Sequence, residues 1–256
     1  MRKWYYYSAF LLLAATTCGR TDFQARIALD VPPIPDGEVC NYRVLARTDS
    51  IGTYTALVRQ DWLGDEELPV FGVAVVMRTA TGQVPTTDSS VVLVRRSNLL
   101  PRSSFRFIRT GAALSTTAAN YSDKSVAISS YLAGEEKQRL LPVTARTFDI
   151  DELTFLGRSL RFDKTKPVKI TVVNPMGPPP GGASFEAEFL LKGDEMVSVP
   201  AGSFDCRKLM LKAMDMEIEL WYEKYGTGRL VKYRAEAAGL TIELLPTPPE
   251  PVTGGR

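Results

Sequence analysis

Residues 216–223 read Met-Glu-Ile-Glu-Leu-Trp-Tyr-Glu, and this stretch decides the fold class. Apolar side chains recur at every second position, at Met216, Ile218, Leu220 and Tyr222. Glutamates fill the positions between and after them, except at Trp221. Because successive side chains of a strand point to opposite faces, this period of two predicts a β-strand with one buried face and one polar face.

The same alternation recurs elsewhere in the chain. Residues 168–172 read Val-Lys-Ile-Thr-Val, and residues 185–189 read Phe-Glu-Ala-Glu-Phe. Glycine-containing turn signals separate such runs, at residues 81–82, 133–134, 192–194, 225–228 and 238–239. Between Cys206 and Leu245 we expect three consecutive strands. Strands spaced at roughly 10–15 residues with hardly any helix predict a mainly β fold, a large antiparallel meander that forms a curved open sheet or an incomplete barrel or sandwich.

The segment 149–160 is the one that fits a helix. Asp149 is suited to cap its N-terminus, and Glu152 is suited to reach back to the cap, as in a capping box. The apolar residues near one face of this helix are Ile150, Leu153, Leu156 and Leu160. A single short helix beside a large sheet is expected to plug or cover an open end, so these four residues are our candidates for a lid.

The first 17 residues have the pattern of an export signal. Arg2 and Lys3 precede the apolar run 9–15, which is too short to span a bilayer as a helix. Cys18 follows, and small residues before a cysteine resemble the bacterial lipobox, in which that cysteine is lipidated. We therefore expect lipidation at Cys18 and a place in the cell envelope, on the periplasmic face of the outer membrane. Ordinary signal-peptidase cleavage nearby and an uncleaved anchor are the alternatives.

Two cysteines remain once Cys18 carries lipid. Exported proteins lie where disulfides persist, so Cys40 and Cys206 are a candidate pair. A bridge between them would tie the first strand to the C-terminal part of the sheet, and bridges of this kind typically contribute about 2–4 kcal/mol. The alternative is two separate buried thiols.

Two proline-rich stretches bound the expected domain. Residues 18–35 contain Pro-Pro-Ile-Pro and are expected to form a stiff spacer behind the anchor. Residues 246–256 are expected to form a disordered tail, so a single β-rich domain would span residues 36–245. Arg2 and Lys3 account for the whole formal charge of +2. The exported chain is therefore balanced, which supports neither a nucleic-acid partner nor electrostatic attraction to a membrane.

The chain contains no histidine, which removes Ser-His-Asp and Cys-His mechanisms and every His-ligated zinc site. Asp149, Asp151 and Glu152 form the nearest approach to an acidic cluster, and their spacing fits helix capping better than acid–base catalysis. Residues 177–182 lack the lysine and the following helix of a phosphate loop and are expected to form a hairpin loop or linker. We therefore expect no enzyme, catalytic residue, metal site or cofactor.

Charged residues of two strands are expected to face solvent. Glu217, Glu219 and Glu223 lie on the polar face of the 216–223 strand. Arginines such as Arg106 alternate with Phe105 and Phe107, which is typical of one solvated face and one core face rather than of a nucleic-acid platform.

Several motifs occur in the order found in the bacterial domain of unknown function 3108. They are Gly-Glu at 37–38 before a strand with Tyr42, Asn-Leu-Leu-Pro at 98–101, the helix at 149–160, Pro-Ala-Gly-Ser-Phe at 200–204, and Gly-Leu-Thr-Ile-Glu-Leu at 239–244. Together they span about residues 36–245, and the chain resembles that family over this length. Cys40, Cys206 and the prolines of 174–182 depart from the family pattern. The resemblance implies an exported β-rich protein with no assigned activity, so no catalytic residue carries over. The expected architecture is also similar to the unclosed barrel of the lipoprotein carriers LolA and LolB.

Three functions follow from these expectations. The first is a non-enzymatic, lipid-anchored envelope protein that binds an apolar ligand or a partner protein on its curved sheet, because the second face of a large sheet needs a cover. It would contact the membrane through its N-terminal lipid, with a lipid or an envelope protein as partner. The second is a scaffold of envelope assembly without a ligand pocket. The third is a hydrolase that uses carboxylates or a Ser–Lys pair.

Overall fold

The computed structural model describes residues 27–63, 68–81, 84–132, 134–163, 166–177 and 182–247. The expected signal peptide, the lipidation site Cys18 and most of the expected tail lie outside these residues. Within the described ranges, no helix is long and apolar enough to cross a membrane.

The first eight strands are β1 (Glu38–Ala46), β2 (Asp49–Leu63), β3 (Leu68–Thr81), β4 (Val84–Arg95), β5 (Pro101–Thr110), β6 (Ala113–Tyr121), β7 (Ser125–Leu132) and β8 (Glu135–Pro142). The others are β9 (Thr147–Asp149), β10 (Val168–Asn174), β11 (Ala183–Val199), β12 (Gly202–Ala213), β13 (Met216–Glu223), β14 (Leu230–Ala235) and β15 (Leu240–Leu244). Helical turns are η1 (Ile150–Glu152), α1 (Leu153–Leu156), η2 (Gly157–Ser159) and η3 (Glu236–Ala238).

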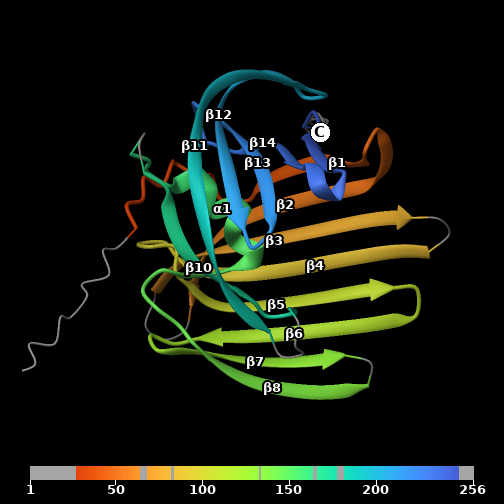
Figure 1. Cartoon of the computed structure of the whole chain (residues 1–256), viewed down its shortest axis with the longest axis vertical. Coiled ribbons are helices and arrows are strands. Elements are labelled where there is room, and N and C mark those ends of the chain that lie inside the picture. The colour runs from red at the N-terminus through yellow and green to blue at the C-terminus, as the bar shows by residue number, and fades with distance from the viewer. Residues whose placement is uncertain are drawn as a thin grey trace, which may run out of the picture.

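All of these strands form one sheet in the order β8-β7-β6-β5-β4-β3-β2-β1-β15-β14-β13-β12-β11-β10-β9. Strands that follow one another in the sequence pair antiparallel, except that β8 does not pair with β9 and that β9 runs parallel to β10. The first strand in the sequence, β1, pairs with the last, β15. The sheet curls so that β10–β14 lie in front of the wall made by β2–β8 (Figure 1). Its terminal strands β8 and β9 are not joined to each other, so the barrel stays open. The predicted curved, open antiparallel sheet is confirmed.

The segment from η1 to η2 lies between the two walls of the curled sheet (Figure 1). Leu153, Leu156 and Leu160 are buried, Ile150 is half-buried, and all four pack in the core cluster that joins the walls. The segment therefore fills the inner space instead of covering an open end, and we refer to the face of the sheet toward it as the inner face. Its α-helical part is a single turn, so the expectation of a continuous helix over 149–160 is wrong in extent.

The capping box at the start of this segment is confirmed. Asp149 accepts a hydrogen bond from the backbone N–H of Asp151 (3.0 Å), and Glu152 accepts one from the backbone N–H of Asp149 (2.6 Å). These bonds satisfy backbone donors that the first helical turn leaves without partners. The segment can therefore begin inside the protein without an unpaired backbone group at Asp149 or Asp151.

The alternation of 216–223 is realised in β13. Ile218, Leu220 and Tyr222 are buried on the inner face, and Met216 at the strand end is exposed. Two predictions about neighbouring turns are wrong. The stretch from Cys206 to Leu245 contains the rest of β12 and all of β13, β14 and β15, four strands and not three, because the turn at Met214 uses a non-glycine residue with φ of 51° that gives no sequence signal. Residues 192–194 form a bulge within β11, not a turn.

Part of the expected spacer is packed on the domain. Leu29 pairs with Leu160 as an isolated bridge, and Asp30 donates a backbone hydrogen bond to Ser159 (2.7 Å). Ile34 is buried in the core, and its carbonyl accepts a hydrogen bond from the side chain of Gln60 (2.8 Å). The folded part of the chain thus includes residues before Asp36.

Cys40 and Cys206 are not bonded to each other, so the structure shows the alternative of two buried thiols. Cys40 lies in the main core on the inner face. Cys206 is out of step with the inward Leu209 and lies on the outer face, in a small cluster with Trp221. A bridge would have to pass through the sheet. Burial raises the pKa of both thiols, that of Cys206 to about 12, which keeps them in the unreactive form.

Candidate ligand-binding cleft

In β5, Arg106 points inward and the two phenylalanines point outward. Arg106 and Ser104 lie on the inner face, whereas Phe105 is 45% exposed and Phe107 is half-buried on the outer face. The expectation that the phenylalanines face the core and the arginines face solvent is therefore wrong for Phe105, Phe107 and Arg106, whereas Arg109 does face solvent. The inward position of Arg106 is stable because two carboxylates meet it there.

Arg106 binds one carboxylate from the sheet and one from the helical segment. Its Nε and Nη2 donate to the two oxygens of Asp88 at 2.8 and 2.5 Å, and its Nη1 donates to Asp151 at 3.0 Å. All three side chains are largely buried. A bidentate Arg–carboxylate pair with a further acceptor satisfies most of the guanidinium, which offsets much of the cost of taking the charge out of water.

Two more carboxyl groups lie beside this pair. Asp149 is fully buried and accepts a hydrogen bond from the Tyr121 hydroxyl (2.7 Å). Glu152 is also fully buried, and its Oε2 has no hydrogen-bond partner. We call Asp88, Arg106, Asp149, Asp151 and Glu152 the Arg106 cluster. It holds four carboxyl groups and one guanidinium, so its acidic groups outnumber their counter-charge.

Burial and mutual repulsion shift these acids toward the protonated form. Burial raises the pKa of Asp149, and burial together with Asp149 raises the pKa of Glu152 well above its ordinary value. Burial, with repulsion from Asp149, raises the pKa of Asp151 to about 7 against the pull of Arg106. Asp151 is therefore an acid that changes its protonation state near neutral pH at the inner surface of the protein.

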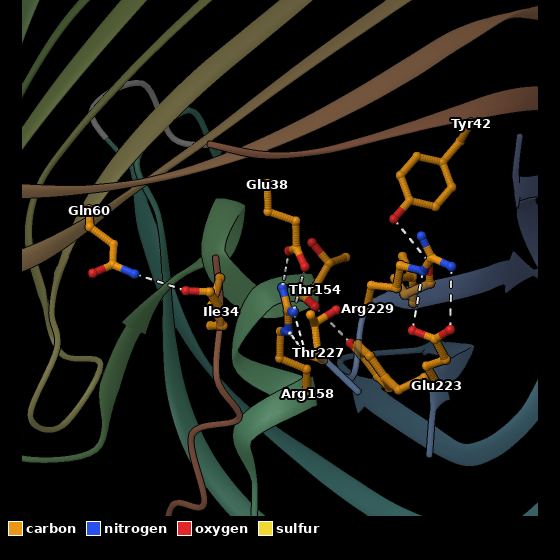
Figure 2. A network of polar contacts seen from close by, with 11 residues as sticks. Ile34, Glu38, Tyr42, Gln60, Thr154, Arg158, Glu223, Thr227 and Arg229 are labelled. Atoms are coloured by element: carbon orange, nitrogen blue, oxygen red, sulfur yellow. Dashed lines mark hydrogen bonds and ion pairs between the residues drawn. The ribbon is translucent and has the colours of Figure 1, made fainter. Parts of the chain in front are cut away.

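A second buried arginine holds the other end of the helical segment. Arg158 donates to both oxygens of Glu38 at 2.6 and 3.1 Å and to the carbonyl of Thr227 at 3.0 Å (Figure 2). The Tyr222 hydroxyl donates to the carbonyl of Thr154 at 2.9 Å. Gly157 permits this approach, because a Cβ there would lie 2.3 Å from that hydroxyl oxygen. The segment is thus fixed to β1 and β13.

Between these two anchors lies a cleft of about 190 Å³ between the helical segment and the inner face of the sheet. Its apolar wall comes from β3, β14 and β15, with Val75, Met77, Leu230, Tyr233, Leu240 and Ile242. Asp88, Arg106 and Asp151 line it on the side of β4 and β5. A cavity of about 40 Å³ shares Tyr54, Val75, Thr154 and Leu230 with it and extends toward Cys40. The cleft therefore combines an apolar wall with one charged end.

A wider cleft of about 410 Å³ lies between the 27–35 segment and β11–β13. Four of its seven ionic side chains already have partners: Arg158 with Glu38, Lys224 and Asp194 with each other (2.8 Å), and Glu223 with Arg229 (3.2 Å). Its polar lining is thus mostly engaged within the protein. The smaller cleft at the Arg106 cluster has the composition expected of a small-molecule site, apolar walls with a few converging polar groups.

The sequence singled out some of these residues and missed others. Asp149, Asp151 and Glu152 were expected to cap a helix, and they also bring carboxyl groups to Arg106. Ile150 lines the smaller cleft and Leu160 lines the wider one, whereas Leu153 and Leu156 lie in the core alone. Asp88 gave no signal, because a single acid in an otherwise neutral strand does not show its partner. The charged end becomes visible only when β4, β5 and the helical segment are placed together.

A protein-family model described as a protein of unknown function, DUF3108, matches residues 41–243, and the chain belongs to this family. No curated protein matches the chain. Among solved structures, the chain is similar to a β-barrel-like protein of the domain of unknown function DUF1849 from Brucella abortus, with a TM-score of 0.52 and 10% identity. The match covers 86% of this chain and 98% of that one. At this identity the likeness concerns the fold.

Proposed function

We propose that this protein is a non-enzymatic binding protein of the cell envelope that holds a small amphipathic molecule in the cleft beside the Arg106 cluster. The observation that carries the proposal is the meeting of an apolar wall with converging charged groups in one cleft. Lipidation at Cys18 and the place at the outer membrane are part of the proposal. A missing histidine and a balanced charge support binding over catalysis.

The dimensions of the cleft indicate the size of its ligand. Apolar cavities of about 150 Å³ hold a molecule of the size of benzene. The cleft of about 190 Å³ would therefore hold one or two rings or a short alkyl chain, not a whole lipid. The helical segment occupies the rest of the inner space. This fits a small-molecule binder better than a carrier of acylated proteins.

The charged end indicates the polar group of the ligand. Asp88 and Asp151 share Arg106, and the buried Asp149 and Glu152 lie behind them. This excess of acid favours a hydrogen-bond donor or a cation over an anion. We therefore propose a ligand with an apolar body and an amine or another N–H donor.

1-Naphthylamine, a fluorescent amine with two fused rings that is neutral near pH 7, tests the proposal by titration. The chain from Gly19 onward contains every described element and suits this measurement. We expect saturable binding at one site. Val75→Phe should fill the cleft and weaken binding at least about tenfold, which corresponds to 1.4 kcal/mol.

The matched control is Val76→Phe, because Val76 is the next residue of β3 and lies on the outer face. This variant should bind the probe as the unchanged chain does. Equal losses in both variants, or no saturable binding by the unchanged chain, would contradict the proposal.

The scaffold function keeps one observation in its favour. Leu153, Phe155 and Leu156 fill the inner space, so most of the curled sheet is packed like an ordinary core. A chain that binds neither the probe nor any small molecule extracted with it, and that crosslinks to one envelope protein, would support the scaffold over the binder.

A further inference from the structure

One row of outward side chains runs across ten paired strands, from β12 through β15 and β1 to β6. In register order it contains Lys208, Trp221, Lys232, Glu243, Arg43, Thr53, Arg78, Thr87, Arg109 and Leu114. In the first part of the row, up to Arg43, cations lie beside acids. In the second part, from Thr53 onward, the only charged residues of the row are the arginines Arg78 and Arg109. This change separates two regions of the same surface.

The first region, which we call the ion-paired face, covers β12–β15 and β1. Each of four cations on this face lies beside a glutamate, in the pairs Lys208–Glu219 (2.7 Å), Arg234–Glu219 (2.6 Å), Lys232–Glu243 (2.9 Å) and Arg43–Glu243 (2.6 Å). Lys208 and Lys232 also lie over the ring of Trp221, at 4.8 and 5.9 Å. Two glutamates thus each hold two cations, so each of these four cations already has an acidic partner within the protein.

The second region, which we call the arginine-flanked face, covers the outer face of β2–β7. Arg59, Arg78 and Arg109 are exposed, and none has an acidic or hydrogen-bonding partner within the described part of the chain. Among the described outward side chains of β2–β6, no Asp or Glu accompanies them. The balanced charge of residues 18–256 thus conceals a local excess of positive charge.

Apolar side chains lie in rows beside these arginines. One cross-strand row contains Leu57, Ala74, Val91, Phe105 and Ala118, and the next contains Val76, Phe107 and Tyr131. Phe105 and Tyr131 are 45% and 46% exposed, so large aromatic groups meet solvent here. Large aromatic groups exposed beside half-buried apolar ones are a feature of interaction surfaces, because folding alone does not require their exposure.

We propose that the arginine-flanked face rests on the surface of a membrane that contains anionic lipids. Aromatic and aliphatic groups flanked by arginine side chains suit the boundary between headgroups and acyl chains, where Arg pairs with phosphate while apolar groups enter the boundary. The charged groups among the described outward side chains of β2–β6 are positive, which fits an anionic surface. The apolar groups are spread over several strands, which fits an extended surface better than a peptide that fills a groove.

Vesicle flotation tests this proposal with the chain from Gly19 onward, which lacks the signal and Cys18. The vesicles are phosphatidylcholine alone or phosphatidylcholine mixed with phosphatidylglycerol. We expect binding to the mixed vesicles only, and weaker binding at high salt. Each arginine near an anionic surface contributes about fivefold in affinity, so R78Q/R109Q should bind about 30-fold more weakly.

The matched control is K212Q/R234Q, which removes two cations from outward positions of β12 and β14, each 43% exposed and each paired with a glutamate. Its net charge equals that of R78Q/R109Q, and it should bind nearly as the unchanged chain does. Equal losses in both double variants would reduce the effect to net charge and overturn the proposal. Equal binding to neutral and mixed vesicles, or none to either, would also overturn it, as would a dimer that Phe105→Ser abolishes.

Discussion

The ion-paired face and the arginine-flanked face are two regions of one outer surface, and they differ in how their charges are arranged. The inner faces of most of these strands pack in one core. On the ion-paired face each of Lys208, Lys232 and Arg234 has a glutamate beside it. On the arginine-flanked face Arg109 and Phe105 of β5 face solvent, while Arg106 of the same strand points inward. The first arrangement is what stability alone favours. The second costs free energy on both faces, and we infer that binding maintains it: a ligand inside and a membrane outside.

The largest difference in stability is expected between removing Arg106 of the inner face and removing Arg234 of the ion-paired face. Arg106→Met leaves Asp88 and Asp151 largely buried without their counter-charge, and we expect the free energy of unfolding to fall by about 3–5 kcal/mol at neutral pH. Arg234→Met on the ion-paired face should cost at most about 1 kcal/mol. Urea unfolding of both variants measures this. Similar costs would show that Arg106 is no more than a surface charge.

Gly157 of the helical segment closely contacts Tyr222 of β13, which is a strand of the ion-paired face. Substitution can break and partly restore this contact. Gly157→Ala should destabilise the protein by about 1–3 kcal/mol, because the added Cβ would lie 2.3 Å from the Tyr222 hydroxyl oxygen. Tyr222→Phe in the same chain removes that oxygen and should recover part of the loss. Thermal unfolding of the single and double variants gives the coupling. No recovery in the double variant would place the strain elsewhere.

Asp151 of the Arg106 cluster and Glu219 of the ion-paired face should make stability depend on pH in opposite directions. The raised pKa of Asp151, about 7 against an ordinary 3.8, means that the folded chain binds this proton more tightly. This contribution to stability is present at low pH and is lost as the pH rises through about 7, with a slope of up to about 1.4 kcal/mol per pH unit. Asp149 and Glu152, whose pKa values are also raised, contribute to the same fall, so Asp151→Asn should reduce its slope between about pH 4 and 7.

Glu219 of the ion-paired face provides the comparison. Its carboxylate is held by Lys208 and Arg234, which lower its pKa below the ordinary 4.5 against the effect of burial. Its contribution is therefore present above pH 4.5 and is lost as the pH falls through the lowered value. Glu219→Gln should flatten the acid limb of the stability profile and leave the neutral limb unchanged. Urea unfolding across pH separates the two, and a neutral limb of unchanged slope in Asp151→Asn would contradict this assignment.

The smallest effect on stability is expected at the exposed aromatic side chain. Phe105→Ser removes a ring that is 45% exposed, so the free energy of unfolding should change by no more than about 0.5 kcal/mol. Leu220→Ala, on the inner face of β13, should cost about 2–5 kcal/mol. A loss at Phe105 as large as that at Leu220 would mean that the ring serves the fold and not a binding surface.

Local patterns predicted local structure well. The period of two in 216–223 gave β13 with its correct inner face, and the three-residue spacing of Asp149 and Glu152 gave the capping box. Both depend on neighbours in the sequence. The same period in β5 showed two faces but not which one is inside, because that choice depends on Asp88 and Asp151, which lie 18 and 45 residues from Arg106.

Two other errors have readable causes. Cys206 is three residues from Leu209, so the two must point to opposite faces of one strand, and this alone argues against a bridge to an inward Cys40. The turn at Met214 and Asp215 contains neither glycine nor proline and could not be found from composition. The cleft itself was beyond reach, since its walls come from β3, β14, β15 and the helical segment.

The central claim is that one outer face binds membranes and the other does not. An environment-sensitive fluorophore attached to Phe105→Cys or to Met210→Cys compares them directly, because Met210 lies on the outer face of β12 and the native Cys40 and Cys206 are buried. With vesicles containing phosphatidylglycerol, we expect a blue shift from the label at position 105 and no shift from the label at position 210. A shift at position 210 alone, equal shifts at both positions, or no shift at either would contradict the account.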